Sequence, residues 1–208
     1  MGRFIVLEGG EAAGKSTQAR LLAERLGAVL TREPGGTAVG EALRLALLNT
    51  GLPRPVPRAE ALMMLAARAQ HVAEVIEPAL AAGNDVVCDR YSGSTLAYQG
   101  YGRGLDVSEL AELDSWSRAG REPDVVVLLE VPLELARSRH IARLFDVSGL
   151  PAKKAGLADR FESEGNEFWE RVIAGFGQLA SADPVRWRVV NGTGTVEEVA
   201  ARVRKAVG

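Results

Sequence analysis

The chain has little cysteine, little histidine and no long apolar run. It contains one cysteine, Cys88, and two histidines, His71 and His140, among 208 residues. No intrachain disulfide is possible, and within the apolar segment 85–89 we expect Cys88 to be a buried small side chain rather than a reactive thiol. Neither histidine has partners at metal-ligand spacing, and no segment approaches the ~20 apolar residues that cross a bilayer. These absences exclude a disulfide scaffold and argue against a histidine-bound metal or a membrane-spanning chain.

An excess of charge of one sign is also absent. The chain has 25 Lys and Arg against 27 Asp and Glu, a formal net charge of −2, so it has no broad electrostatic attraction to nucleic acid or anionic membrane. The first apolar run, FIVL (4–7), is too short for a signal peptide. We therefore expect a cytoplasmic protein with no nucleic-acid or membrane partner, in which basic residues can still converge on a small anionic ligand.

What the chain does contain is an alternation of short apolar runs and longer helical patterns. Its length and its 47% hydrophobic and 25% charged residues suit one domain spanning residues 1–208. Runs rich in Val, Ile and Leu without polar alternation are typical of parallel strands buried on both faces. We expect such strands at 3–8, 28–31, 85–89, 124–130 and 187–191. Helical periodicity predicts helices at 16–26, 39–48, 59–82, 108–119, 133–143, 162–181 and 196–207.

This pattern predicts a doubly wound α/β fold, with a five-stranded parallel sheet, helices on both faces and ligands beyond the carboxyl ends of the strands. Two segments interrupt the alternation. Residues 50–58 contain three prolines and are expected to form a stiff surface connection. Residues 145–159 mix Gly, Pro, Ser and Lys, and we expect a mobile lid at about 139–160, because a long loop in a compact domain is often a lid.

A glycine-rich segment, GGEAAGKST (9–17), separates the first expected strand from the first expected helix. It fits the pattern G-x-x-x-x-G-K-[ST] in the strand-to-helix setting that a phosphate loop needs. Its glycines let backbone N–H groups approach phosphate oxygens, and the helix N-terminus adds partial positive charge. We expect Lys15 to bridge the β- and γ-phosphates and Ser16 to hold Mg²⁺. The predicted ATP site comprises Gly9, Gly10, Glu11, Ala12, Ala13, Gly14, Lys15, Ser16 and Thr17.

Two later segments predict a second anion site. TREPGGT (31–37) and DRYSGSTLAYQG (89–100) follow the second and third expected strands, so both lie at the ligand-binding edge of the sheet. Arg32 and Arg90 could each reach an anion there, and Asp89, at the end of a strand, could accept a hydrogen bond from Mg²⁺-bound water. The alternative is that Asp89 and Arg90 simply pair with each other or cap a helix.

Arginines also occur on two apolar helical patterns. Arg44 lies in one, and Arg68 lies in the other, four residues after Met64 and therefore on the same helical face. An arginine in such a stripe is usually solvated or snorkelling, so by themselves both suggest surface positions. They are ligand-binding candidates only if these helices line the pocket.

Together these motifs resemble the thymidylate kinase family, the nucleoside monophosphate kinases that phosphorylate thymidine monophosphate (dTMP). The resemblance covers nearly the whole chain. It rests on EGGEAAGKST (8–17), TREPGGT, the M-x-x-x-R pair, DRYSGSTLAYQG and DRFE (159–162). It implies the fold of the phosphate-loop nucleoside monophosphate kinases, ATP as phosphoryl donor, Mg²⁺, and a homodimer packed through apolar helical faces.

The resemblance also implies roles for single residues. Glu11 matches a position that hydrogen-bonds the sugar 3′-hydroxyl, Arg44 and Arg90 match arginines that grip the acceptor phosphate, and Arg68 matches an arginine at the thymine edge. Tyr98 matches an aromatic under the sugar that would crowd a 2′-hydroxyl. The predicted substrate-binding set is Glu11, Arg32, Pro34, Arg44, Met64, Arg68, Arg90, Ser94, Thr95, Tyr98 and Gln99, with Thr95 and Gln99 beside the base. The predicted Mg²⁺ residues are still Ser16 and Asp89.

Met64 departs from the family, which usually has a phenylalanine there that stacks on thymine. A thioether still packs against a ring, worth ~0.3–1.5 kcal/mol. We expect a conservative replacement in a hydrophobic wall; the alternative is a weaker or less selective base site.

The variable part of the phosphate loop, residues 10–13, contains no cation that could stabilise the transition state. Lys15 is then the only basic residue of the loop. The bacterial branch of the family, which this loop resembles, uses lid arginines for this purpose. Arg139 and Arg143 are four apart and share a helical face, and we expect them to close onto the ATP phosphates as catalytic residues with Lys15 and Arg90. The alternative is a solvated basic helix end.

The sequence therefore predicts Mg²⁺-dependent transfer of the ATP γ-phosphoryl group to dTMP, giving the diphosphate for dTTP synthesis. No strong general base is needed, because the acceptor oxygen is already ionised near neutral pH. Two other functions stay open: a kinase for another deoxynucleotide or a nucleoside, and a nucleotide-dependent switch or assembly ATPase. A nucleoside has no phosphate for Arg44 and Arg90 to bind, and a switch needs no separate acceptor site.

Overall fold

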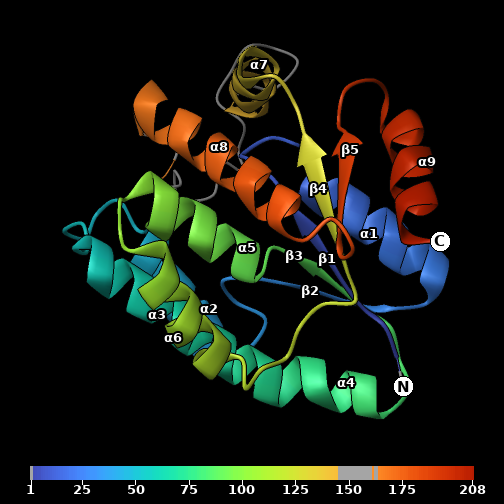
Figure 1. The fold of residues 1–208 in the computed structure, drawn as a ribbon, viewed down its shortest axis with the longest axis horizontal. Coiled ribbons are helices and arrows are strands. Elements are labelled where there is room, and N and C mark those ends of the chain that lie inside the picture. The colour runs from blue at the N-terminus through green and yellow to red at the C-terminus, as the bar shows by residue number, and fades with distance from the viewer. Residues whose placement is uncertain (1, 145–160, 162–163) are drawn as a thin grey trace.

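A computed structural model describes residues 2–144, 161 and 164–208. Its centre is a five-stranded parallel sheet with strand order β2-β3-β1-β4-β5 (Figure 1). The strands are β1 (Phe4–Glu8), β2 (Val29–Arg32), β3 (Val86–Asp89), β4 (Val125–Glu130) and β5 (Trp187–Asn191). All five predicted strands are confirmed within about one or two residues at each end, the normal uncertainty of an element boundary.

Helices connect the strands in the predicted alternation. They are α1 (Lys15–Leu26), α2 (Ala38–Leu48), α3 (Pro57–His71), α4 (Glu77–Ala81), α5 (Ser92–Thr95), α6 (Val107–Ser117), α7 (Leu133–Leu144), α8 (Asn166–Ala182) and α9 (Val196–Val207), with π-helical turns η1 (Val72–Ile76) and η2 (Leu96–Gly102). The helix predicted at 59–82 is one continuous helical run of α3, η1 and α4. Residues 50–56, in the proline-rich segment, form a largely exposed connection, as predicted.

The sequence pattern missed the helical segment at 92–102 and misplaced the start of α8. Gly93 and Gly102 weaken the helical pattern, yet packing requires them. A Cβ on Gly93 would lie 2.7 Å from Trp187, and one on Gly102 would lie 2.6 Å from Phe168. The helix predicted from residue 162 begins at Asn166, because Gly165 before it is extended rather than helical.

The sheet is covered on both faces, as the doubly wound prediction requires (Figure 1). Alternate side chains of β1 point to opposite faces. Ile5 and Leu7 pack with α1 and α9, whereas Phe4 and Val6 pack with the η1 and α4 segment. Farther along the second face, α8 packs against β4 and η2 through an aromatic cluster.

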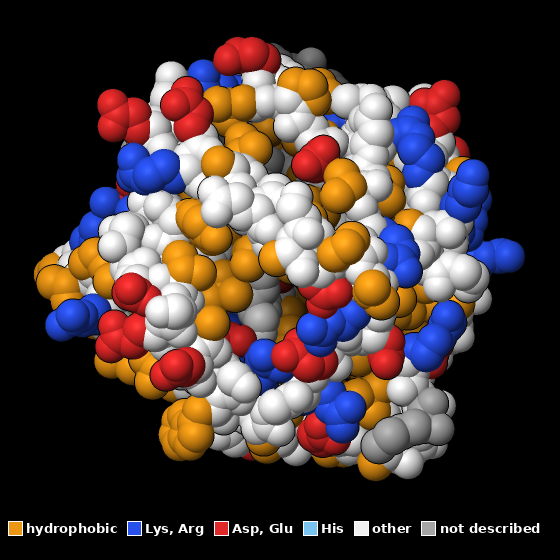
Figure 2. Space-filling view, in the orientation of Figure 1, with side chains coloured by type: hydrophobic (Ala, Val, Ile, Leu, Met, Phe, Trp, Pro, Cys, Tyr) orange, Lys and Arg blue, Asp and Glu red, His pale blue; other side chains and the backbone are white. Residues whose placement is uncertain are grey.

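The surface mixes charges of both signs, as a net charge of −2 suggests. Lys and Arg are interspersed with Asp and Glu over the face shown in Figure 2. Among the described residues, no helix is long and apolar enough to span a membrane.

The strand order brings the sequence motifs together. β3 lies between β1 and β2, and Asp89 is level with both Leu7 and Arg32 in the sheet register. The segments that follow these three strands therefore leave the sheet side by side at its carboxyl edge. These are the glycine-rich loop, TREPGGT and the DRYSGS turn.

Candidate active site

The glycine-rich loop has the backbone of a phosphate-binding loop. Gly9 has φ of 140°, and a Cβ there would lie 2.5 Å from the Leu129 carbonyl oxygen. Gly14, at φ 97°, is the N-cap of α1 and provides no side-chain cap. Both glycines adopt conformations that side chains rarely allow, and the uncapped N–H groups of the first turn of α1 are available for an anion.

Lys15 lies inside this loop as a buried cation. Its side chain donates a hydrogen bond of 2.6 Å from Nζ to the Gly10 carbonyl oxygen and is only 5% exposed. Burial, followed by repulsion from Arg90, lowers the pKa of Lys15 from 10.5 to about 8, against the attraction of Glu11 and Asp89. Its positive charge is therefore incompletely compensated, and an anion in the loop would stabilise it.

Ser16 and Asp89 form a pair whose oxygens suit Mg²⁺. The Ser16 hydroxyl donates to Asp89 Oδ2, and Asp89 Oδ1 is buried without a hydrogen-bond partner among the described residues. An unpartnered carboxylate oxygen beside a hydroxyl fits a hard cation that takes most of its ligands from water and phosphate. No group of three or more His, Cys, Asp and Glu in the described part of the chain could hold a metal by itself. The donor set thus fits a cation that arrives with a nucleotide.

Arg90 crosses from the DRYSGS turn to the phosphate loop. It adopts a positive φ of 74°, and its Nη1 donates to the Gly9 carbonyl oxygen and to Ser94 Oγ, each at 3.0 Å. Its Nη2 pairs with Glu11, and its guanidinium lies over the Tyr98 ring, 5.0 Å from the centroid. Burial opposes its charge, but Tyr98 and the surrounding carboxylates raise the pKa of Arg90 above its usual range.

Asp89 and Arg90 thus have different partners in the structure, Ser16 for the first and Glu11 for the second. The alternative that they merely pair with each other finds no support in these contacts. The two adjacent side chains therefore point in different directions and contact different parts of the phosphate loop: Asp89 contacts Ser16, and Arg90 contacts Glu11 and Gly9.

Glu8 holds the turn that carries Arg90, through hydrogen bonds to Tyr91 and Ser94. It was not among the site residues predicted from the sequence. It is fully buried at the end of β1 and accepts hydrogen bonds from the backbone N–H groups of Tyr91 (2.9 Å) and Ser94 (3.0 Å) and from Ser94 Oγ (2.6 Å). Burial raises the pKa of Glu8, while these hydrogen bonds and Arg90 act in the opposite direction. An acidic residue that ends an otherwise apolar strand was the signal available in the sequence.

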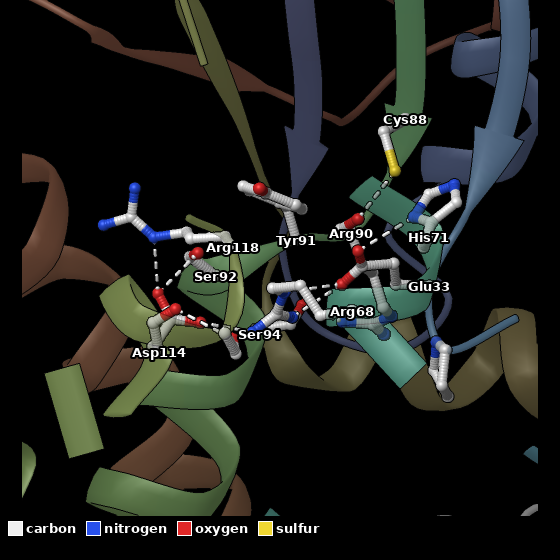
Figure 3. Close-up of polar contacts among 12 residues, drawn as sticks. Glu33, Arg68, His71, Cys88, Arg90, Tyr91, Ser92, Ser94, Asp114 and Arg118 are labelled. Carbon is white, nitrogen blue, oxygen red and sulfur yellow. Dashed lines mark hydrogen bonds and ion pairs between the residues drawn. The ribbon is translucent and has the colours of Figure 1, made fainter. Parts of the chain in front are cut away.

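Arg68 is buried, which corrects the surface position that its helix alone suggested. It is 2% exposed, and it donates from Nε to Glu33 Oε2 (2.8 Å) and from Nη1 to Asp114 Oδ1 (2.5 Å) (Figure 3). Asp114 in turn accepts from Ser92 Oγ (2.7 Å) and Arg118 Nε (2.8 Å). These carboxylates come from elements remote in sequence, and they make burial of the arginine possible because a buried charge must be paired.

His71 belongs to the same buried network and is fully enclosed. Its Nδ1 lies 2.9 Å from Glu33 Oε1 (Figure 3). Its Nε2 lies 2.6 Å from Thr31 Oγ1. His71 is thus a packed residue of α3, at 0% exposure. The side chain of His140 lies outside the described residues.

One cavity of about 300 Å³ runs between the phosphate loop and the segments that carry Arg68 and Arg90. It contains both Lys15 and Arg90. The predicted site residues that line it are Glu11, Ala12, Gly14, Lys15, Ser16, Thr17, Arg32, Pro34, Arg44, Met64, Arg68, Asp89, Arg90, Ser94, Thr95, Tyr98 and Gln99. Glu33, Leu48, Tyr91 and Phe161 line it too, and the sequence had not indicated them as site residues.

Two of the predicted arginines lie at the TREPGGT end of this cavity. Arg32 is half exposed and its Nη2 is 2.9 Å and 3.0 Å from the two carboxylate oxygens of Glu41. Arg44 donates from Nη1 to the Pro34 carbonyl oxygen at 2.9 Å. Arg44 is therefore directed at the loop that forms the cavity wall rather than at bulk solvent.

The remaining predicted residues do not line the cavity. Gly9, Gly10 and Ala13 shape the loop backbone behind it. Arg139, on α7, donates to the Gly192 carbonyl oxygen at 3.0 Å, in the loop after β5. The side chain of Arg143 and the lid segment 145–160 lie outside the described residues.

The fold and the site define a class of protein. A parallel sheet covered by helices carries a phosphate loop with a hydroxyl–carboxylate pair on one side of a cavity, and on the other side lie the buried Arg68 and the partly buried Arg90. This is the arrangement of a phosphate-loop nucleotide-binding protein with a second site for an anionic ligand.

Comparison with known proteins gives the family. A sequence model described as thymidylate kinase matches residues 7–203. The thymidylate kinase of Geobacter sp. (strain M21) is 45% identical over 212 residues, covering 100% of this chain and 92% of that protein. That of Synechococcus sp. (strain JA-2-3B'a(2-13)) is 46% identical over 209 residues, covering 98% and 93%. The crystal structure of thymidylate kinase from Ehrlichia chaffeensis has a TM-score of 0.77 at 30% identity, covering 100% and 99%. The chain belongs to the thymidylate kinase family.

Proposed function

We propose that this member of the family transfers the γ-phosphoryl group of ATP to dTMP, yielding ADP and dTDP for dTTP synthesis. The observation that carries the proposal is the single cavity that holds Lys15 of the phosphate loop and Arg90 of the DRYSGS turn. Two anions brought to these cations would meet end to end, which is the geometry that phosphoryl transfer requires.

The donor is held by the phosphate loop. Backbone N–H groups at the start of α1 face the triphosphate, and Lys15 bridges its β- and γ-phosphates. Ser16 and Asp89 would hold Mg²⁺, which when bound neutralises charge on the β- and γ-oxygens. The buried, unpartnered Asp89 Oδ1 supports this placement.

The acceptor lies on the arginine side of the cavity. Arg90 and Arg44 bind the dTMP phosphate, and Glu11 accepts a hydrogen bond from the 3′-hydroxyl. Glu11 already accepts from Tyr98 Oη at 3.2 Å, so the carboxylate and the ring lie together where the sugar would bind. A ring in this position crowds a 2′-hydroxyl and favours deoxyribose.

The base lies farther along the same wall. Met64 packs against one face of it, Arg68 donates toward its edge, and Thr95 and Gln99 lie beside it. All four residues line the cavity. Because Arg68 is held by Glu33 and Asp114, it meets the base as a rigid donor rather than a flexible one.

Charge that develops in the transition state is met by arginines as well as by Lys15. Arg90 is always protonated and lies beside the phosphate loop. Arg139 is anchored at Gly192, where a Cβ would lie 3.4 Å from the Ala13 carbonyl oxygen of that loop. We propose that Arg139 and Arg143 reach the ATP phosphates from α7. The acceptor phosphate is already ionised near neutral pH, so the residues position and neutralise and none needs to act as a strong base.

A monophosphate panel tests the proposal. Purified protein with ATP and Mg²⁺ is assayed for ADP formation with dTMP, dUMP, dCMP, dAMP, dGMP and thymidine. We expect dTMP to be the best acceptor and thymidine to be inactive, since it offers Arg44 and Arg90 no phosphate. Highest activity with another base would contradict the substrate assignment, and slow hydrolysis independent of any acceptor would indicate a switch or assembly ATPase.

We also propose a homodimer packed through α3 and α6. Three large apolar side chains on these two adjoining helices are exposed: Trp116 (82%), Leu62 (58%) and Leu113 (42%), and exposed apolar surface can mark an interface. Sedimentation at several concentrations tests it. Trp116→Lys should shift wild-type dimers toward monomers, and a wild type that sediments as single chains throughout would refute the dimer. The predicted cytoplasmic location stays a prediction.

A further inference from the structure

Glu60 is a buried carboxylate behind the base end of the cavity. It lies on α3, four residues before Met64 and eight before Arg68, so the three share one helical face. Met64 and Arg68 line the cavity. Glu60 lies outside the lining and is only 2% exposed.

Glu60 touches one residue of the cavity wall directly. Gln99 Nε2 donates to Glu60 Oε1 at 2.9 Å, and both side chains are buried. Gln99 lines the cavity, and no donor among the described residues reaches its Oε1. Its amide therefore has one end on Glu60 and the other end unbonded.

Arg103 holds the charge of Glu60. It donates from Nε to Glu60 Oε1 (3.0 Å) and from Nη2 to Glu60 Oε2 (3.1 Å), a two-pronged pair. Its guanidinium is itself fixed over the Phe168 ring, 4.7 Å from the centroid, and its Nη1 donates to Glu164 at 2.7 Å. Burial opposes the charge of Arg103, but Glu60 and Glu164 raise its pKa above the usual value.

An ionised carboxylate accepts hydrogen bonds and cannot donate them, whereas a glutamine amide can do either according to which end it presents. Beside ionised Glu60, Gln99 can present only its NH₂. Its carbonyl oxygen must then face away from Glu60, toward the cavity. The direction of an amide that has two nearly equivalent orientations is thus decided by a neighbour that does not line the cavity.

A carbonyl oxygen in the base site distinguishes pyrimidine bases by whether the nitrogen at ring position 3 carries a hydrogen. Thymine and uracil carry an N3–H donor there, while cytosine carries an acceptor lone pair. We propose that Glu60, held by Arg103, is a positioning residue that fixes the Gln99 amide with its oxygen toward the base, and thereby selects a pyrimidine with an N3–H. This inference rests on the proposed dTMP kinase function.

The test compares kcat/KM for dTMP with kcat/KM for dCMP. Glu60→Gln has the same shape but can donate as well as accept, so Gln99 is free to turn. We expect the dTMP/dCMP ratio to fall by ~10-fold or more, as when a site loses a hydrogen bond that distinguishes substrates, with KM for ATP nearly unchanged. Glu164→Gln is the matched control: it removes the other carboxylate on Arg103, leaves the Gln99 contact intact and should preserve the ratio.

A purely structural role for Glu60 would have a different signature. It would lower activity with both nucleotides equally, and its effect would add to that of Gln99→Leu. If Glu60 acts through Gln99, Glu60→Gln in the Gln99→Leu background should not change the ratio further. An unchanged ratio in folded Glu60→Gln, or additive effects in the double variant, would overturn the proposal.

A second route does not depend on the stability of Glu60→Gln. In Arg103→Gln, Glu60 loses the two-pronged pair that fixes the direction of its carboxylate, so the Gln99 amide loses its fixed acceptor. The same loss of ratio is expected, and an unchanged ratio would again count against the proposal. Wild-type protein that does not phosphorylate dTMP at all would instead refute the proposed function, so the two failures are distinguishable.

Discussion

The donor and acceptor halves of the site are built in opposite ways. The proposed donor half is one contiguous loop, residues 9–17, whose glycine conformations and uncapped helix start leave backbone N–H groups available for an anion. The acceptor half is assembled from arginines that buried carboxylates hold in place across long sequence distances, such as Arg68 between Glu33 and Asp114. A backbone site tolerates little change of shape, whereas a side-chain network tolerates little change of charge. Variants should separate the two.

The largest effect is expected at the donor half. Lys15→Met removes the cation that meets the β- and γ-phosphates, so kcat should fall by ~10³-fold or more. The dTMP dissociation constant, measured by calorimetry without ATP, should change little, because the acceptor half remains intact. Near-normal turnover in this variant would contradict the placement of the triphosphate.

Next comes the junction between the halves. Arg139→Ala should lower kcat by ~10²-fold or more with both substrates still bound, because an arginine that stabilises transition-state charge acts little in the ground state. Arg137→Ala, on the same helix and paired with exposed Glu134, is the matched control and should retain nearly full activity. Equal kcat in the two variants would show that Arg139 is a surface residue.

A smaller but distinct effect is expected from the acceptor network. Asp114→Asn leaves buried Arg68 and Arg118 undercompensated, so unfolding free energy should drop by ~3 kcal/mol or more. The exposed pair of Arg20 and Glu24 provides the comparison, since Arg20→Ala should cost no more than ~0.5 kcal/mol. Urea unfolding at one protein concentration measures both. Similar losses of unfolding free energy in the two variants would mean that the buried network contributes no more to stability than an exposed ion pair.

The smallest effect is a pH dependence of kcat/KM, and it tests the donor half alone. Because the pKa of Lys15 is lowered to about 8 in the free site, kcat/KM for ATP should fall above pH 8, approaching tenfold per pH unit. kcat/KM for dTMP at saturating ATP should fall later, since bound phosphate stabilises the protonated lysine. Lys15→Arg, which stays charged, should lack this limb. If kcat/KM for ATP depends on pH in the same way in wild type and Lys15→Arg, Lys15 is not the titrating group.

The same shift affects stability in the opposite direction. The folded pKa of Lys15 lies below its ordinary value of 10.5, so between about pH 8 and 10.5 the unfolded chain binds more protons than the folded one. The unfavourable contribution of burying this charge is present below pH 8 and disappears as pH rises through that window. In Lys15→Met this contribution is absent at every pH.

Much of the donor half was predictable because its interactions are local. Glycines at fixed spacing between an apolar strand and a helix determine a loop that needs no distant partner. The same holds for the strands, whose unbroken Val, Ile and Leu content indicates burial on both faces. Arg90 was also identified, because it directly follows the end of a strand at the ligand-binding edge.

The acceptor half was predictable only in part. The pocket roles of Arg44 and Arg68 came only from family resemblance, and the two carboxylates that hold Arg68, Glu33 and Asp114, were not predicted. Glu60 and Asp114 are ordinary acids in the sequence, and nothing local distinguishes them from solvated ones; only Glu8 had a local signal, because it ends an apolar strand. Arg68 alone looked like a surface residue for the same reason.

The amino-acid sequence by itself determined the alternation of strands and helices, the phosphate loop and hence the class of ligand, because each depends on periodicity or on contacts between near neighbours. Tertiary structure alone decided which acids are buried against which arginines, and therefore which way Arg68 and Gln99 present their hydrogen-bonding atoms. The physical reason is that a charge can be buried only beside its counter-charge, and here the counter-charges arrive from strands and helices far apart in the chain.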